Sequence, residues 1–278
     1  MTTRPDERGP AVAEPGQLLE ADEPAAFRVC QQDGQSPFFL TCDHAGAVVP
    51  RRLNSLGLSD EDLRRHIAWD IGAAGVAVKL ANRLDAWTIL QTYSRLVIDC
   101  NRRPGGPDSI IRISETTPIP GNEAVCAEEA TAREREVFRP YHDRIRTELD
   151  QRKVQQRDTA LISVHSFTPC FHGNQRPWHI GVLYNRDRRL ASELLNSLRQ
   201  QPGLVVGDNE PYAVGDETDY TIPIHAEARG LPHVGIELRQ DLIAGEAGQA
   251  QWAERLARAF VSILRSGDFR CRFDLATS

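Results

Sequence analysis

The stretch FFLTCDHAG at residues 38–46 joins an apolar run of strand length to a histidine and small residues. A short run of large apolar side chains predicts a strand that is buried on both faces. His44 lies two residues beyond that run, and Ala45 and Gly46 after it let another backbone segment approach closely. The stretch therefore predicts a buried strand that ends at an accessible imidazole.

Four further apolar runs have the pattern of buried strands, and amphipathic segments separate them. The runs are 87–91 (WTILQ), 95–98 (RLVI), 160–164 (ALISV) and 233–238 (HVGIEL). Helices are predicted at 71–84, at 128–152 with Val137, Tyr141, Ile145 and Leu149 on one face, around Trp252, Leu256, Phe260 and Leu264, and after the N-cap Ser59. This alternation predicts an α/β fold, a three-layer sandwich with a central mixed sheet and with functional groups just beyond the strand ends.

The composition suits one folded domain preceded by a leader. Residues 1–24 are rich in Pro, Glu, Asp, Ala and Gly and carry few large apolar groups, which predicts a flexible N-terminal leader. Hydrophobic residues make up 40% of the chain and charged residues 26%, so a sizeable core can form. Residues 25–278 are therefore predicted to form a single α/β domain.

The charge balance and the cysteines exclude several classes of protein. The chain has 33 basic and 39 acidic residues and no basic tail, so neither nucleic acid nor an anionic membrane is expected as its main partner. No two of the six cysteines form a Cys-x-x-Cys pair, which argues against zinc-ribbon and iron–sulfur sites. The N-terminus has no apolar signal core, and no run approaches the roughly 20 apolar residues of a membrane span. We expect a cytoplasmic protein with reduced thiols.

Two histidines come at the ends of predicted strands: His44 after 38–42 and His165 after 160–164. A single histidine is usually structural, but two at equivalent strand ends favour a shared metal ion. A catalytic zinc site commonly takes three protein ligands from histidine and carboxylate side chains. Asp70 and His66 are the candidates for the third ligand, and their spacing does not decide between them.

Charged residues accompany two of the predicted strands. Arg95 begins the run at 95–98, and Asn101 and Arg102 follow it. The planar guanidinium binds a carboxylate by two hydrogen bonds, so this cluster indicates a small anionic substrate. Glu237 interrupts the last run, which is costly for a charge unless the group is paired or functional. A proton-transfer role is one interpretation, and a buried ion pair with Arg239 or another arginine is the alternative.

Taken in order, these motifs resemble the N-formylglutamate amidohydrolase family, which is similar in turn to the aspartoacylases and zinc carboxypeptidases. The resemblance covers roughly residues 36–265. It rests on the strand–His–small-residue motif with Pro50, on Asp-x-Asn-Arg at 99–102, on Val-His-Ser at 164–166 and on Ile-Glu-Leu at 236–238.

The resemblance implies a phosphorylase/hydrolase-like α/β fold and one divalent metal ion, for which zinc is expected. By position it implies the following roles: His44, Asp70 and His165 as metal ligands, Glu237 as general base and acid, Arg95 as the group that polarises the scissile carbonyl, and Asn101 and Arg102 as holders of a substrate carboxylate. His225 is expected to line the pocket, with a packed structural histidine as the alternative.

The chain also departs from the pattern of its relatives. Ala47 stands where the carboxypeptidase-like proteins have the glutamate of their His-x-x-Glu pair, and the stretch 216–225 (DETDYTIPIH) differs from that of deformylating members. The expected activity is hydrolysis of an N-formyl or N-acyl amide of an acidic amino acid, with N-formylglutamate as the example and the acyl group left open.

Two other functions remain open at this point. One is a nucleophilic hydrolase that uses Cys42, Cys100, Ser163 or Ser166, although no Gly-x-Ser-x-Gly elbow is present. The other is a non-catalytic protein that binds small carboxylates through Arg102.

Overall fold

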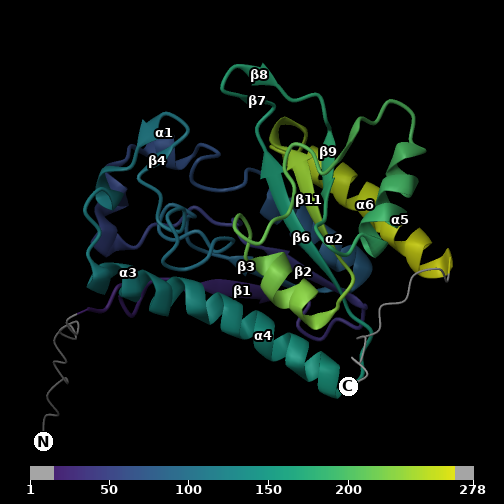
Figure 1. Cartoon of the computed structure of the whole chain (residues 1–278), viewed down its shortest axis with the longest axis horizontal. Helices are drawn as coiled ribbons and strands as arrows, with labels where there is room; N and C mark the ends of the chain where they lie inside the picture. The colour runs from purple at the N-terminus through teal and green to yellow at the C-terminus, as the bar shows by residue number, and fades with distance from the viewer. Residues whose placement is uncertain (1–15, 267–278) are drawn as a thin grey trace, which may run out of the picture.

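A central mixed sheet organises the computed structural model, which describes residues 16–266 of the chain (Figure 1). Its strands are β1 (Phe27–Cys30), β2 (Phe38–Cys42), β3 (Trp87–Gln91), β6 (Ala160–Phe167), β9 (Ile180–Leu183), β10 (Val206–Asp208) and β11 (His233–Arg239). Their order in the sheet is β1-β3-β2-β6-β11-β9-β10. Neighbours among β3, β2, β6 and β11 are parallel, whereas β1 and β9 run antiparallel to β3 and β11.

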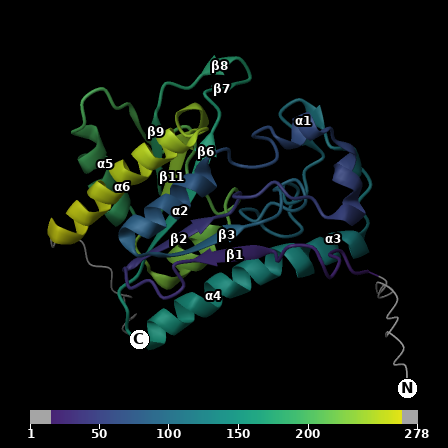
Figure 2. The ribbon, with the colours of Figure 1, turned by 180° about the vertical axis from the view of Figure 1, so that it is seen from behind.

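Helices cover both faces of this sheet, as the sequence predicted. One face packs against α2 (Ala73–Leu84), α5 (Arg189–Arg199) and α6 (Glu246–Ser266). The other face packs against α4 (Arg139–Val154) and long irregular segments. The opposite views in Figures 1 and 2 show α4 on one side of the sheet and α2 with α6 on the other. The three-layer α/β sandwich is therefore confirmed.

The long helix predicted at 128–152 is confirmed, with one local change of helix type. It consists of α3 (Ala127–Arg133), a π-helical turn (Glu134–Phe138) and α4. The side chains predicted for its inner face, Val137, Tyr141, Ile145 and Leu149, are all completely buried. Burial of this apolar face fixes the helix against the sheet.

The helix predicted at 71–84 begins two residues later, at Ala73. Its N-cap is Gly72, which has a left-handed φ of 80°. A Cβ atom at this position would lie 2.1 Å from the carbonyl oxygen of Ile243, so only glycine fits. The helix start leaves Asp70 in the preceding turn instead of in a capping position.

The prediction of a strand at 95–98 is wrong. The segment is buried, as its apolar side chains implied, but it forms turns. The carbonyl oxygens of Leu96 and Val97 accept hydrogen bonds from the side chains of Asn122 (2.9 Å) and Arg133 (2.9 Å). Because these side chains satisfy the backbone, the segment needs no neighbouring strand.

Short elements complete the described part of the chain. They are α1 (Asp60–Leu63), β4 (Ile113–Ser114), β5 (Thr117–Pro118), β7 (Cys170–Phe171), β8 (Asn174–Gln175), the 3₁₀ helices Arg51–Gly57, Pro120–Asn122, Glu227–Arg229 and Gln240–Leu242, and the π-helical turn Ile222–Ala226. Ser59 caps α1, since its hydroxyl accepts a hydrogen bond from the backbone amide of Asp62. This confirms the predicted N-cap.

Part of the predicted leader, residues 1–15, lies outside the described residues. The rest of it, residues 16–24, packs on the domain. Leu18 is buried, and the backbone amides of Leu18 and Leu19 donate to Oε2 of Glu136 at 2.9 and 2.8 Å. These contacts anchor the second part of the segment that was predicted to be flexible.

No helix in the described residues is long and apolar enough to cross a membrane. Five cysteines lie in this part of the chain, and all five have free thiols.

Candidate active site

The sheet brings the predicted residues together on the face that α4 covers. Along β6 and β11, the residues that point into the α2–α6 core alternate with Ser163, His165, Gly235 and Glu237. The register of these parallel strands pairs His165 with Glu237. His165 lies inside β6, which runs three residues beyond the strand predicted from the sequence.

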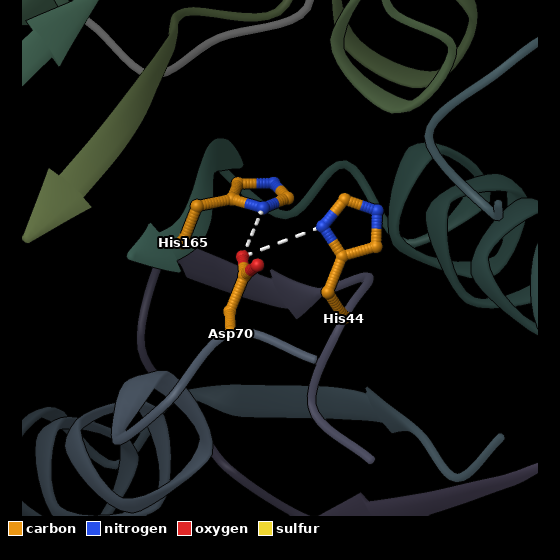
Figure 3. Close-up of side chains that lie close together, drawn as sticks. All are labelled: His44, Asp70 and His165. Carbon is orange, nitrogen blue, oxygen red and sulfur yellow. Dashed lines mark hydrogen bonds and ion pairs between the residues drawn. The ribbon is translucent and has the colours of Figure 1, made fainter. Parts of the chain in front are cut away.

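His44, Asp70 and His165 form one buried group. Nδ1 of His44 lies 3.3 Å from Oδ2 of Asp70, and Nδ1 of His165 lies 2.9 Å from the same oxygen. Figure 3 shows the Asp70 carboxylate facing both imidazole rings. Each residue offers one ligand atom, and these atoms lie within 4.8 Å of one another, so the group could hold a metal ion.

The second nitrogen of each imidazole faces another carboxylate. Nε2 of His44 lies 2.7 Å from Oδ1 of Asp99, and Nε2 of His165 lies 3.3 Å from Oδ2 of Asp43. An acceptor at Nε2 holds the proton there and leaves Nδ1 free to bind a metal ion. The two outer carboxylates therefore orient both imidazoles towards Asp70.

Further hydrogen bonds hold Asp43 in place. Tyr141 of α4 and Thr221 donate their hydroxyl protons to its Oδ1 at 2.8 and 2.9 Å. The hydroxyl of Ser163 lies 3.4 Å from Oδ2 of Asp43 and 3.0 Å from Nε2 of His165. Through Asp43, the helix that covers the sheet helps to position His165.

The buried site carries a surplus of negative charge. Besides Asp43, Asp70 and Asp99 it contains Glu237, whereas the guanidinium of Arg95 is shared between Asp99 and Asp70. Burial by itself would lower the pKa values of the site imidazoles, but the neighbouring carboxylates raise the pKa of His44 and bring that of His165 well above its usual value. A divalent cation suits this excess of negative charge.

Glu237 is buried without a partner. Its Oε2 has no hydrogen-bond partner, and no ion pair with it occurs in the described residues. Arg239, the partner considered from the sequence, instead binds Asp241 with an Nε–Oδ1 distance of 2.8 Å. Burial raises the pKa of Glu237 to about 7. A carboxyl group with this pKa can both take up and release a proton near neutral pH.

A pocket of about 350 Å³ opens above these residues. Arg95, Asn101 and Arg102 line it together with the His–Asp–His group and Glu237. Nε and Nη2 of Arg95 donate to Oδ2 of Asp99 at 3.0 and 2.6 Å. Arg102 donates to the carbonyl oxygens of Asn101 and Thr218, and no ion pair with it occurs between residues 16 and 266. The guanidinium of Arg102 is thus available in the pocket to pair with a substrate carboxylate.

Asn101 is held firmly beside Arg102. Its side-chain amide donates to Oδ1 of Asp219 at 2.8 Å, and its Oδ1 accepts from the backbone amides of Tyr220 and Thr221, both at 3.0 Å. The side chain therefore fastens the segment around residues 218–221 across the pocket.

The structure separates two candidate residues from the group that could bind a metal ion. His66 lines the pocket, but its Nε2 lies 3.0 Å from Oε1 of Glu115. His225 is not among the pocket residues. It is buried, and its Nε2 lies 2.9 Å from Nδ1 of His142, with the two rings stacked. This placement corresponds to the structural alternative for His225, and it leaves Asp70 as the carboxylate between the two histidines.

Sequence reasoning missed the roles of Asp43 and Asp99. Both were present in the motifs, directly before His44 and at the start of Asp-x-Asn-Arg. The available signal was chemical, because a metal-binding histidine needs an acceptor at its second nitrogen. The sequence did not show which acidic residue faces which ring.

A family model for N-formylglutamate amidohydrolases matches residues 36–244. The chain resembles the crystal structure of a gene product from Agrobacterium tumefaciens, with 36% identity and a TM-score of 0.87 over 91% of this chain and 100% of that one. It also resembles N-formylglutamate amidohydrolase from Ralstonia eutropha JMP134, with 18% identity and a TM-score of 0.64 over 87% of this chain and 98% of that one. No curated protein is significantly similar to it in sequence. Because the matched region is most of the domain, the chain belongs to the N-formylglutamate amidohydrolase family.

Proposed function

We propose that this amidohydrolase is metal-dependent and cleaves an N-formyl or N-acyl amide of an acidic amino acid, with N-formylglutamate as the reference substrate. The observation that carries the proposal is the convergence of His44, Asp70 and His165, whose ligand atoms lie within 4.8 Å of one another next to the unpaired Glu237.

The donor set fits a divalent ion such as zinc. Two imidazoles and one carboxylate are a common ligand set of catalytic zinc, and the outer carboxylates Asp43 and Asp99 fix both rings. When bound, such an ion supplies Lewis acidity, which lowers the pKa of water from about 15.7 towards 7 and polarises a carbonyl group.

The chain's own residues account for the proton transfers. Oε2 of Glu237 has no other partner and takes a proton from the attacking water as the oxygen adds to the amide carbon. Glu237 then gives this proton to the leaving nitrogen as the C–N bond breaks, so that a carboxylic acid and an amine are released. Arg95 lines the pocket beside Asp70 and stabilises the negative charge that develops on the carbonyl oxygen.

Substrate recognition falls to Arg102 and to its neighbour Asn101. Arg102 lines the pocket with its charge unpaired in the described part of the chain and binds the carboxylate of the amino acid. Asn101, fixed by its three hydrogen bonds, holds the backbone that carries Arg102. This positioning keeps the scissile amide beside Glu237.

The test is hydrolysis of N-formylglutamate by purified protein before and after treatment with a chelator, with zinc restored at the end. We expect activity to disappear with the metal and to return with zinc. Glu237→Gln should lower kcat by about 10²–10⁴-fold while zinc content is unchanged. The matched control is Glu254→Gln on the exposed side of α6, where Glu254 pairs with Arg83. Full activity after removal of the metal would refute metal dependence.

One observation favours a serine nucleophile as a second candidate. The hydroxyl of Ser163 lies 3.0 Å from Nε2 of His165, and Nδ1 of His165 lies 2.9 Å from Oδ2 of Asp70. The three side chains are thus connected in the sequence serine, histidine, aspartate, as in a Ser–His–Asp triad. The thiols do not compete, because burial raises the pKa values of Cys42 and Cys100 well above their usual range.

Replacement of Ser163 by Ala separates the two mechanisms. A nucleophilic serine would lose about 10⁴-fold or more of kcat in this variant, whatever the metal content. If Ser163 only orients His165, we expect a much smaller loss, and added zinc should recover part of it. Inactivation by a serine reagent together with indifference to chelators would favour the triad.

A further inference from the structure

One side of the pocket is an aromatic wall made of Phe167, Phe171 and Tyr212. Phe167 ends β6, Phe171 lies in β7, and Tyr212 follows β10. Figure 1 shows the β7–β8 hairpin projecting beyond the end of β6. Three separate segments thus contribute aromatic rings to the pocket lining.

A buried arginine packs against all three rings. The guanidinium carbon of Arg176 lies 5.8, 4.5 and 4.9 Å from the ring centres of Phe167, Phe171 and Tyr212. Arg176 is buried, its Nη1 has no hydrogen-bond partner, and it is not among the residues that line the pocket. Its planar group packs against the rings, so the wall is formed before any substrate arrives.

The wall and the carboxylate-binding residues come from different segments of the chain. Asn101 and Arg102 follow β3, whereas the wall comes from the end of β6 and from segments after β6 and β10. In the sheet order β3-β2-β6-β11-β9-β10, the strand before His44 lies between β3 and β6. Burial and the charge of Glu237 raise the pKa of Tyr212, which is consistent with a ring close to the proposed base.

We propose that the acyl group of the substrate is large and apolar, with an aromatic ring, and that it packs against the aromatic wall. The inference rests on the proposed function. A substrate whose carboxylate is held by Arg102 and whose amide lies at Glu237 extends its acyl group towards Phe171 and Tyr212. A formyl group is a single carbon with one oxygen and leaves these rings uncovered, whereas an aromatic acyl group removes their faces from water.

The size of the pocket supports a larger acyl group. Its volume of about 350 Å³ lies in the range of pockets that bury ligands well beyond the size of a formyl amino acid. Leu183, Val214 and Ile222 add further apolar surface to the lining. Burial of a phenyl ring in such surroundings is expected to raise kcat/KM by about tenfold or more when the ring is held in the transition state.

The experiment compares kcat/KM for N-acetylglutamate and N-phenylacetylglutamate, with N-formylglutamate included as the reference. The acetyl and phenylacetyl amides have similar intrinsic reactivity, so their ratio reports binding of the ring. We expect the zinc-loaded protein to prefer the phenylacetyl substrate by at least tenfold.

Variants of the wall should change this ratio. Phe171→Ala and Tyr212→Ala should each lower the preference at least fivefold, and Arg176→Met should lower it through loss of ring positioning. The matched control is Tyr184→Ala, because Tyr184 also packs under an arginine, Arg188 at 4.9 Å, but does not line the pocket. The ratio does not depend on the fraction of folded enzyme, so a purely destabilising substitution leaves it unchanged.

The outcomes separate this inference from the proposed function. Hydrolysis of N-formylglutamate or N-acetylglutamate without preference for phenylacetyl overturns the aromatic acyl group and leaves the proposed function standing. A preference that the Phe171, Tyr212 and Arg176 variants all retain also overturns it. If none of the N-acylglutamates is cleaved by zinc-loaded protein, the proposed function fails, and the acyl assignment fails with it.

Discussion

Oδ1 of Asp99 lies 2.7 Å from Nε2 of His44, and Oδ2 of the same carboxylate accepts a hydrogen bond from Nη2 of Arg95 at 2.6 Å. One side chain thus connects a proposed metal ligand to the proposed carbonyl-binding arginine. Although burial disfavours its charged form, the charges of Arg95 and His44 hold the pKa of Asp99 well below its usual value. Asp99 therefore stays ionised and keeps both neighbours in place.

Replacement of Asp99 by Asn should weaken zinc binding by about 10–100-fold, because His44 loses the carboxylate that orients it. The dissociation constant can be measured by competition with a chromogenic chelator. Asp241→Asn is the matched control, since Asp241 also binds an arginine, Arg239, but lies exposed outside the pocket. Equal zinc affinities in the two variants would contradict the role of Asp99.

Arg102→Met should raise KM for an N-acylglutamate by about 10–100-fold, because a charge-assisted hydrogen bond to the substrate carboxylate is lost. The change in kcat should be small. Arg103→Met provides the control, because Arg103 is the next residue in the chain but is exposed and does not line the pocket. An unchanged KM for Arg102→Met would remove Arg102 from substrate binding.

The carboxyl group of Glu237 should titrate near pH 7 in metal-free protein, since burial raises its pKa to about 7. A bound divalent cation should lower this pKa, because a nearby positive charge favours the carboxylate. Carbon-13 NMR of glutamate-labelled protein, with Glu237→Gln to assign the signal, measures both values. A titration near the ordinary value of about 4.3 in metal-free protein would show that the carboxyl group is solvated.

His142 should contribute a loss of stability in mild acid. Burial lowers the pKa of His142 to about 4. Its Nδ1 lies 2.9 Å from Nε2 of His225, and its Nε2 lies 2.8 Å from the carbonyl oxygen of Cys100. The unfolded chain binds a proton near pH 6.5 but the folded chain does not, so the contribution is full above this pH and is lost as pH falls towards 4. The loss amounts to about 3 kcal/mol in the free energy of unfolding.

Urea unfolding at several pH values measures this slope. His142→Asn should remove the contribution of His142 and so reduce the loss of stability between pH 6.5 and 4, whatever its effect at neutral pH. His172→Asn, at an exposed position, should leave the slope as in the original protein. If His142→Asn keeps the full slope, the proton uptake belongs to another group.

Local patterns in the sequence were enough for much of the fold. The strands predicted at 38–42 and 233–238 and the helix predicted at 128–152 were found because their side-chain periodicity depends on neighbours a few residues away. The same patterns placed His44 and Glu237 beside strand ends or within a strand. The turn at 95–98 could not be predicted this way, since the hydrogen bonds that replace a sheet come from Asn122 and Arg133.

By itself, then, the sequence determined the α/β class, the order of its main elements and a short set of candidate residues. Only the tertiary structure decided that Asp70 and not His66 lies between the histidines, that Asp43 and Asp99 face their outer nitrogens, and that Arg176 packs against three aromatic rings of the pocket. The physical reason is distance along the chain: Asp70 and His165 are 95 residues apart, and strand register and helix packing bring their side chains within 2.9 Å.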